Sequence, residues 1–452
     1  MNQYTKTGID AFPKVLIIGQ PFEKSTGGGI TQSNLFNGWP KEKLAVVCLS
    51  MAFQGKVELD ICDKYYQLGQ KEESWMFPFN LLKKNHFSGQ LTFGESKPTQ
   101  KKTTFRVKMI LNYFLPLLKY FGIVHFAYKV KPSEDLYKWI DAYNPDVVYI
   151  QVTSRAMIAF CLEVEKYLKK PLVFHMMDDW PSLISYKGVL KNYWSRIIDK
   201  ELRILLDRTL VFMSISDFMT AEYRKRYGKE FLPFHNPINL DFWKKHQKTH
   251  YVIGNSASLL YAGRTGLGID ASLKTIAQAV DVLNRERQLD LKFVLQTAEE
   301  PEWSKSYTCV QYRSLSAYQE LPRLFAEADL LILPYDFSRK SLRFIKYSMP
   351  TKASEYMACG TPIVIFAPED TALVQYALSK DWAKVVVKNE VKLLAETLQQ
   401  MIQNQAMRTS IAQKAIAIAE SSHNAAYVAN RFQQTICAAT QKQQKLMPEG
   451  IA

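Results

Sequence analysis

Residues 341–370, SLRFIKYSMPTKASEYMACGTPIVIFAPED, carry the pattern that decides the fold. Pro350 just before a short helical pattern and Gly360 just after it are typical start and stop signals, so we expect a helix between them. A basic, aromatic loop is expected before this helix. The β-branched run 362–366 that follows predicts a buried strand. A short helix leading into a buried strand is the repeating unit of α/β folds.

The first turn of this helix predicts an anion site. Its backbone N–H groups lack helical partners and carry partial positive charge. Lys352 adds a full charge there, and Glu355, one turn on, lies on the same side. A cation on exposed amides beside a carboxylate suits a phosphate and a sugar hydroxyl bound together, as in a nucleotide diphosphate. A capped surface helix before a buried strand is the structural alternative.

Chain length and charge limit the class of protein. The 452 residues exceed the usual size of one domain, so two domains are expected. Of the net charge of +15, residues 1–245 supply most, with 35 Lys and Arg against 24 Asp and Glu. Such an excess predicts an anionic partner for the first half, either nucleic acid or anionic lipid. Because no nucleic-acid recognition motif accompanies the charge, we expect no nucleic-acid partner.

The cysteines and the N-terminus indicate a cytoplasmic protein. Six cysteines are scattered, mostly within apolar runs, without the spacing of a metal or redox site. They are expected to be reduced core residues. The first residues lack the apolar run of a secretory signal.

Strand and helix patterns alternate in both halves, which predicts parallel sheets covered by helices. The polar stretch 238–256 separates the halves. We therefore expect domains over 1–245 and 246–420, a C-terminal helix over 421–440 that returns towards the first domain, and a loose tail over 441–452. In such sheets ligands lie beyond the carboxyl ends of the strands.

Two groups follow strand ends in the first half. Gly28 and Gly29 come after strand 14–19 and begin a helix, so a ligand can approach their backbone closely. Strand 44–50 ends without the acidic residue of a dinucleotide site, which argues against NAD. His175 follows another strand, with Asp178 as the next choice for its role. A structural turn for the glycines and a hydrogen-bonded core histidine are the alternatives.

Residues 101–131 predict contact with a membrane surface. Basic residues flank an apolar, aromatic centre, and the stretch 109–128 barely reaches the roughly 20 residues of a membrane span. Pro116 and Lys119 within it disfavour a straight spanning helix. An in-plane segment with aromatics at the headgroups and Lys or Arg on anionic lipid is favoured. A helix pair buried against the first domain is the alternative.

Taken together, these motifs resemble retaining glycosyltransferases of the GT-B fold, close to glycosyltransferase family 4. The order and spacing of the matching pieces carry the resemblance: Gly28-Gly29, His175, 236–242, 261–264, 321–334 and 350–364. The resemblance implies an α/β protein of two Rossmann-like, doubly wound domains that face each other across a cleft.

The resemblance also implies roles for single residues. Glu355 matches the acid that holds the ribose hydroxyls, and Arg264 matches a cation on the diphosphate. Gly28 and Gly29 match groups near the transferred sugar. The expected catalytic residues are His175, Arg264 and Lys352, and the expected donor-binding residues are Gly28, Gly29, Arg264, Ser348, Met349, Thr351, Lys352 and Glu355.

Two positions depart from the family pattern. Tyr347 stands where the family often has a Glu, and Leu267 stands where a Lys commonly precedes the glycine. Lys352 can supply the missing second phosphate cation. The departures leave open a non-catalytic partner protein that keeps the fold and the membrane contact.

We therefore expect a hexosyltransferase that uses a nucleotide-sugar donor and a lipid-linked or polysaccharide acceptor at the cytoplasmic face of the cell membrane. Retention follows from the resemblance. Arg264, Lys352 and the turn at 350–354 can stabilise the leaving diphosphate without a metal, so neither a metal nor a cofactor is expected. A sugar-nucleotide epimerase is a further alternative.

Overall fold

The structure, a computed structural model, describes residues 12–24, 26–53, 57–77, 79–82, 86–93, 113–184, 188–254 and 256–446. The chain divides into two compact units. The first comprises Met1–Ser214, Tyr223–Leu232 and Ala429–Ala452, and the second comprises Ile215–Glu222 and Pro233–Val428. The main boundaries between the two units thus fall after residues 232 and 428, whereas the predicted domain boundaries fall after residues 245 and 420.

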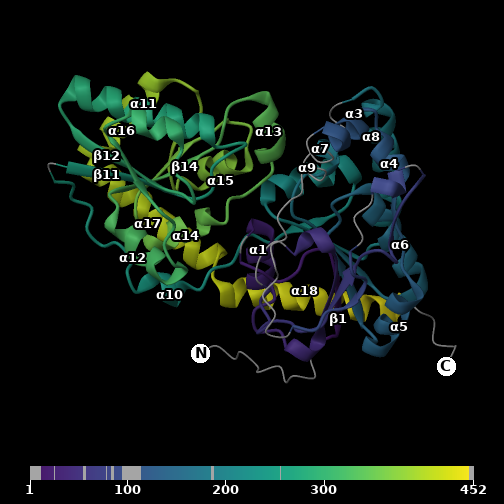
Figure 1. Ribbon diagram of the computed structural model, residues 1–452. Coiled ribbons are helices and arrows are strands. Elements are labelled where there is room, and N and C mark those ends of the chain that lie inside the picture. Colours follow the sequence, from purple (N-terminus) through teal and green to yellow (C-terminus); the bar gives the residue numbers. More distant parts are fainter. Residues whose placement is uncertain are drawn as a thin grey trace, which may run out of the picture. The chain divides into compact units, whose positions relative to one another are not determined.

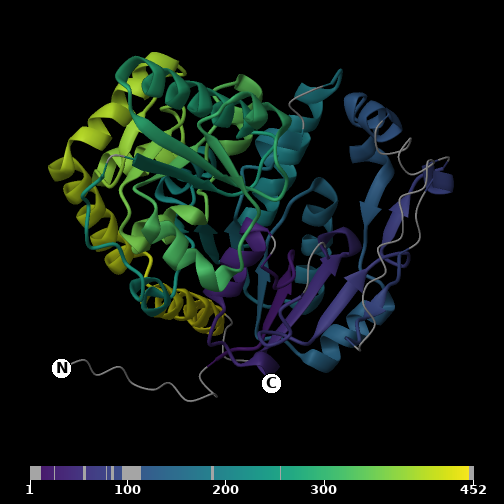
Figure 2. The same cartoon turned by 60° about the vertical axis from the view of Figure 1, so that its left-hand side comes forward.

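The first unit is built on a sheet with the strand order β10-β9-β8-β7-β1-β2-β3-β5. Neighbouring strands from β9 to β3 pair in parallel, whereas β5 pairs antiparallel with β3. Figure 2 shows its purple and blue strands side by side. The central strands β1 and β7 are buried along their whole length, as strands covered on both faces must be. The strands are β1 Val15–Ile18, β2 Leu44–Leu49, β3 Tyr65–Leu68, β5 Gly89–Gln90, β7 Val147–Ile150, β8 Leu172–Met176, β9 Val211–Ser214 and β10 Phe231–Pro233, with a separate pair of β4 Glu73–Trp75 and β6 Tyr128–Val130.

The C-terminal helix α18 packs in the first unit from Ala429 onwards. Phe432 on α18 contacts Phe36 and Tyr149, with ring centroids 4.9 and 6.0 Å apart. Figure 1 shows this helix, in yellow, beside β1. The helices that contribute to this unit are α1 Gly27–Leu35, α3 Leu115–Tyr120, α4 Ile123–Ala127, α5 Glu134–Tyr143, α6 Arg155–Leu168, α7 Pro181–Ile184, α8 Lys191–Asp207, α9 Asp217–Tyr227 and α18 Ala425–Leu446, of which α9 and α18 begin in the second unit.

The second unit contains a parallel sheet with the order β13-β12-β11-β14-β15-β16. The order reverses between β11 and β14, so the carboxyl end of β11 lies at the switch point where such sheets bind ligands. The strands are β11 Ser256–Ala262, β12 Asp290–Gln296, β13 Val310–Arg313, β14 Leu330–Pro334, β15 Ile363–Phe366 and β16 Lys384–Val386. The helices are α10 Leu240–Lys244, α11 Asp270–Arg287, α12 Leu321–Glu327, α13 Arg339–Ile345, α14 Lys352–Cys359, α15 Ala372–Lys380, α16 Val391–Gln403 and α17 Gln405–Ser422. Short 3-10 helices in the chain are Lys41–Lys43, Ser50–Ala52, Phe79–Leu82, Glu302–Ser306 and Tyr318–Glu320.

Three helices differ from the sequence prediction. Helix α13 replaces the expected loop before α14, because Ser338 Oγ accepts from Ser341 N at 3.1 Å and caps it. Helix α15 was not expected and is capped in the same way by Thr371. Helix α18 continues to Leu446, since the Gln and Lys residues after Thr440 are good helix formers. The rest of the predicted tail, after residue 446, lies outside the described residues.

Candidate functional site

Helix α14 begins without a side-chain cap. Thr351 occupies the N-cap position with helical torsion angles, and its side chain makes no capping hydrogen bond. Its carbonyl oxygen accepts from Ser354 Oγ at 3.0 Å. The helix ends at Gly360, whose φ of +75° is the left-handed conformation of a helix C-terminus. The start of α14 therefore keeps the partial positive charge that attracts anions.

Two charged side chains lie on the first turn of α14. The Lys352 ammonium is 5.6 Å from the centre of the Phe325 ring. Glu355 is buried, and this burial raises the pKa of its carboxyl group while the charge of Lys352 lowers it. A carboxylate beside a cation accepts hydrogen bonds from hydroxyl groups, so the pair can bind a phosphate and a diol side by side.

The turn before α14 is held by its own side chains and backbone. Ser348 N donates to Ile345 O at 3.1 Å, and Ser348 Oγ donates to Phe344 O at 3.0 Å. Met349 is partly buried against the core of the second unit. These contacts hold the turn between the end of α13 and the start of α14.

Arg264 follows the carboxyl end of β11. Tyr261 Oη donates to Arg264 O at 2.6 Å, and Arg264 Nη1 donates to Leu267 O at 2.9 Å. The loop turns through Gly266 and Gly268, whose φ angles of +98° and +89° suit glycine alone among common residues. The arginine thus lies at the switch point of the second sheet.

A hydrogen bond joins the two parts of this site. Tyr356 Oη, one turn beyond Lys352, accepts from Ala262 N at 3.1 Å, at the last residue of β11. Tyr356 is fully buried, so its hydroxyl fixes α14 to the strand end. The structure therefore brings the expected donor residues of α14 and the loop of Arg264 to the same edge of the second sheet.

Sequence reasoning gave no role to Tyr356 or to Asn236, although both support this site. Asn236 Nδ2 donates to Ser354 Oγ at 3.4 Å and to Thr351 O at 3.5 Å. Asn236 belongs to a quoted motif, but its partners lie more than 100 residues away in the chain. The only signal in the sequence was that both residues are polar and lie within quoted motifs. Their burial is known only from the structure.

In the first unit, Gly28 and Gly29 lie in the first turn of α1. A Cβ atom on Gly29 would lie 2.1 Å from Glu23 Oε1, so this glycine makes room for a carboxylate of the chain itself. Glu23 is buried and accepts from Thr26 N at 3.1 Å, while Thr26 Oγ1 accepts from Gly29 N at 3.1 Å. The start of α1 is thus next to a buried carboxyl group of the chain itself. Contact of the glycines with a sugar stays a prediction.

His175 lies inside the first unit, on β8. Its Nδ1 is 2.5 Å from Tyr149 Oη on β7, and the tyrosine hydroxyl also accepts from Gln151 Nε2 at 3.1 Å. Burial lowers the pKa of His175 to about 3, so the ring is neutral at neutral pH. This is the geometry of the hydrogen-bonded core histidine, the alternative stated above. A catalytic role for His175 stays a prediction.

The described residues contain no group of three or more His, Cys, Asp or Glu side chains placed to hold a metal ion. The six cysteines are free thiols, and five of them are buried. Burial raises the pKa of Cys48 and Cys161 above the ordinary value of a thiol, which keeps them protonated and unreactive.

Comparison with known proteins identifies the architecture. Residues 275–434 match a family model described as glycosyl transferase-like. This region contains α14 but not Arg264. No curated protein matches the sequence of the chain.

Solved structures match nearly the whole chain at low sequence identity. A glycosyltransferase from Rickettsia africae is 12% identical, with 94% of this chain and 98% of that chain covered and a TM-score of 0.57. HepE from Anabaena, solved in complex with UDP, is 13% identical, with coverages of 94% and 100% and a TM-score of 0.56. WaaG, a glycosyltransferase involved in lipopolysaccharide biosynthesis, is 13% identical, with coverages of 96% and 100% and a TM-score of 0.52. The chain has the GT-B fold.

Proposed function

We propose that this chain of GT-B fold is a glycosyltransferase that moves a hexose from a nucleotide diphosphate sugar to a lipid-linked or polysaccharide acceptor. The observation that carries the proposal is the uncapped start of α14, with Lys352 and the buried Glu355 on its first turn. Tyr356 fixes this helix end to β11, directly before the loop of Arg264. Cations, amides and a carboxylate at one sheet edge suit a nucleotide diphosphate.

The chemistry follows from this arrangement. When the bond between the sugar and the diphosphate breaks, negative charge develops on the leaving phosphate oxygen. Lys352, Arg264 and the amides at the start of α14 are preorganised positive groups that stabilise this charge. The proposed reaction retains the anomeric configuration, as the family resemblance implies, and needs no metal because the two cations neutralise the leaving group.

A ligand screen tests the donor class. We expect UDP-glucose to raise the melting temperature of the protein, because a ligand that binds only the folded state stabilises it by about 2.7 kcal/mol at 100 times its Kd. The UDP complex of HepE favours UDP over other nucleotides. GDP-, ADP- and dTDP-glucose serve as comparisons, and release of UDP in the presence of acceptor reports turnover. The absence of a shift with all four nucleotide sugars would contradict the proposal, and binding without transfer would favour the non-catalytic partner.

The proposed membrane contact rests on an aromatic hairpin, which we define as α3 and α4, residues 115–127. Tyr120 and Phe126 expose 52% and 59% of their surface, and Leu117 and Phe121 are also exposed. Residues 113–131 contain Lys119, Lys129 and Lys131 but no Asp or Glu. Exposed aromatics beside lysines suit the headgroup region of an anionic leaflet. Residues 101–112 of the predicted segment lie outside the described residues.

The aromatic hairpin is firmly attached to the first unit. Gly122 lies against Trp194 on α8, where a Cβ atom would be 2.4 Å from Trp194 Nε1. Arg155 Nη1 donates to His125 O at 2.6 Å, and the same guanidinium pairs with Glu201 at 2.6 Å. The exposed aromatics therefore belong to a folded surface, not to a frayed segment.

No helix among the described residues combines the length and the apolar character needed to cross a membrane. We propose that the protein binds peripherally at the cytoplasmic face of the cell membrane, where a lipid-linked acceptor is available. The comparison with WaaG favours an acceptor of this kind.

Replacing both Phe121 and Phe126 by serine is expected to weaken binding to phosphatidylglycerol-containing vesicles about tenfold, because burial of an aromatic side chain contributes roughly 1.5–3 kcal/mol at most. Vesicle flotation measures the bound fraction. The matched control replaces the exposed Leu378 and Tyr427 of the second unit by serine and should float as the wild type does. Equal flotation with neutral and anionic vesicles would contradict the role of the lysines.

A further inference from the structure

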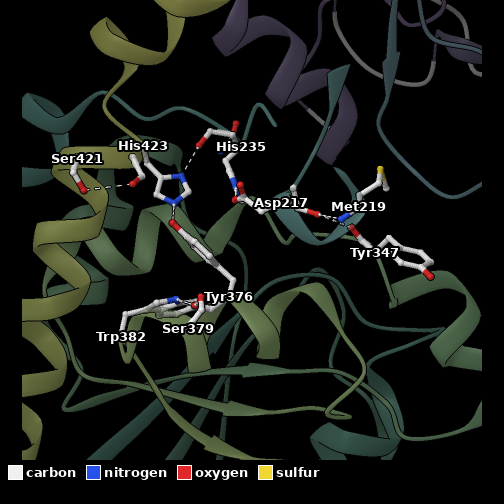
Figure 3. A network of polar contacts seen from close by, with 12 residues as sticks. Asp217, Met219, His235, Tyr347, Tyr376, Ser379, Trp382, Ser421 and His423 are labelled. Carbon is white, nitrogen blue, oxygen red and sulfur yellow. Dashed lines mark hydrogen bonds and ion pairs between the residues drawn. The ribbon is translucent and has the colours of Figure 1, made fainter. Parts of the chain in front are cut away.

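The turn that carries the proposed donor amides is attached to the start of α9. The ring of Tyr347, the residue directly before this turn, stacks on the ring of Phe218 with centroids 5.5 Å apart and an interplanar angle of 30°. Ser216 Oγ is 3.5 Å from Tyr347 O and accepts from Met219 N at 3.2 Å. Figure 3 shows Met219 and the Tyr347 backbone on either side of this contact. These residues all belong to the second unit, because Ile215–Glu222 is counted with it.

The start of α9 is itself anchored. Asp217 Oδ2 lies 2.8 Å from His235 Nε2. The His235 ring stacks on Tyr376, with centroids 5.1 Å apart, and Tyr376 Oη lies 3.1 Å from His423 Nε2. Figure 3 shows these side chains as one continuous network that ends at Tyr347. The contacts of Tyr347 with Ser216 and Phe218 therefore attach it to a well-anchored segment of the second unit.

A second attachment holds the other side of the turn. Ala372 N, at the start of α15, donates to Lys346 O at 2.7 Å. The Lys346 ammonium lies 5.6 Å from the centre of the Tyr347 ring. The backbone at 346–347 is thus held between α15 and α9, and residues 348–352 continue directly from it.

We propose that Tyr347 is a positioning residue for the donor: Phe218 and Ser216 hold it, and it thereby fixes the backbone N–H groups of Met349, Thr351 and Lys352. This inference rests on the proposed function. The Tyr347 side chain is only 8% exposed because Phe218 and Lys346 cover it. Tyr347 therefore acts through the backbone that follows it. The family resemblance implies a Glu at this position, and such an acid would contact the sugar directly.

Binding of two probes separates these two roles. We expect Phe218→Ala and Tyr347→Ala each to weaken the binding of UDP about fivefold, because an aromatic pair of this kind is worth about a tenfold change or less. Each variant should weaken the binding of UDP-glucose by the same factor. Isothermal titration calorimetry measures both Kd values. Tyr347→Phe and Phe218→Tyr keep the stacked rings and should restore wild-type binding. The double alanine variant should bind no more weakly than either single variant, because the two residues act as one pair.

Tyr307→Ala is the matched control, since it removes an aromatic contact with Trp303 directly before β13. It should leave both Kd values unchanged. A loss confined to UDP-glucose would overturn the inference, because it would mean that Tyr347 contacts the sugar. Unchanged binding in both alanine variants would overturn it as well.

Hydrogen exchange makes the test independent of the proposed function. Amides in a peptide covering residues 346–355 should exchange about five times faster in Phe218→Ala and Tyr347→Ala than in the wild type, and at the wild-type rate in Tyr347→Phe. A wild-type protein that binds neither UDP nor UDP-glucose would contradict the proposed function, while the exchange rates would still decide whether Tyr347 holds the turn. Unchanged exchange in the alanine variants would show that it does not.

Discussion

Replacing Lys352 by alanine is expected to lower kcat for glycosyl transfer about 100-fold, and Arg264→Ala is expected to have an effect of similar size. Removing one preorganised group that stabilises developing charge typically costs about 100- to 1,000-fold in kcat. Lys352 lies at the uncapped start of α14, and Arg264 follows the end of β11. Each loss should be larger for kcat than for donor KM, because the charge on the leaving oxygen exists mainly in the transition state.

Steady-state assays of UDP release with UDP-glucose measure this effect. Lys392→Ala is the matched control, because Lys392 is an exposed lysine of the second unit on α16. It should leave kcat unchanged. A decrease of less than threefold in both Lys352→Ala and Arg264→Ala would contradict the proposed diphosphate site.

Lowering the pH from 7.5 to 5.0 is expected to destabilise the fold by about 2 kcal/mol for each of the two buried histidines. Burial lowers the pKa of His175 and of His423 to about 3. The unfolded chain takes up protons on these rings below its ordinary pKa of about 6.5, while the folded protein does not. The stabilisation is therefore complete above pH 6.5 and is lost progressively as the pH falls towards 3.

Thermal melts of His423→Gln at the two pH values test this effect in the second unit. The variant should lose less stability than the wild type between pH 7.5 and 5.0, since glutamine does not titrate. Tyr376→Phe is the control, because it removes the hydroxyl that lies 3.1 Å from His423 Nε2 and keeps the histidine. It should lower the melting temperature at both pH values and leave the difference between them unchanged. A pH dependence of His423→Gln equal to that of the wild type would contradict the effect.

The sequence predicted the two parallel sheets because their strands are continuous apolar runs between helical patterns. Helix α14 was predicted from Pro350 and Gly360, which set its limits through local backbone preferences. Strands β3 to β5 were not predicted, because residues 52–100 are polar and aromatic without a clear period. Strand β3 pairs with β2, and β4 pairs with β6, which is more than 50 residues away in the chain. A local sequence pattern does not show such pairing.

The candidate site could be predicted only where it depends on local chemistry. The helix start with Lys352 and Glu355 follows from spacing along one helix. The supports from Asn236 and Tyr356 depend on tertiary contacts, so no local pattern indicates them. The placement of His175 in the interior likewise follows from the packing of β8 between β7 and β9.

Helix α18 has a practical consequence for dividing the protein into fragments. Phe432, Ile436 and Ala439 are fully buried along one stripe of this helix, and Phe432 covers Phe36 and Tyr149 near the first strands. A fragment that stops at Leu232 would leave these aromatic rings uncovered in water, and it would favour aggregation over folding. An N-terminal half made for separate expression therefore needs the α18 segment supplied through a new covalent link or as an added peptide.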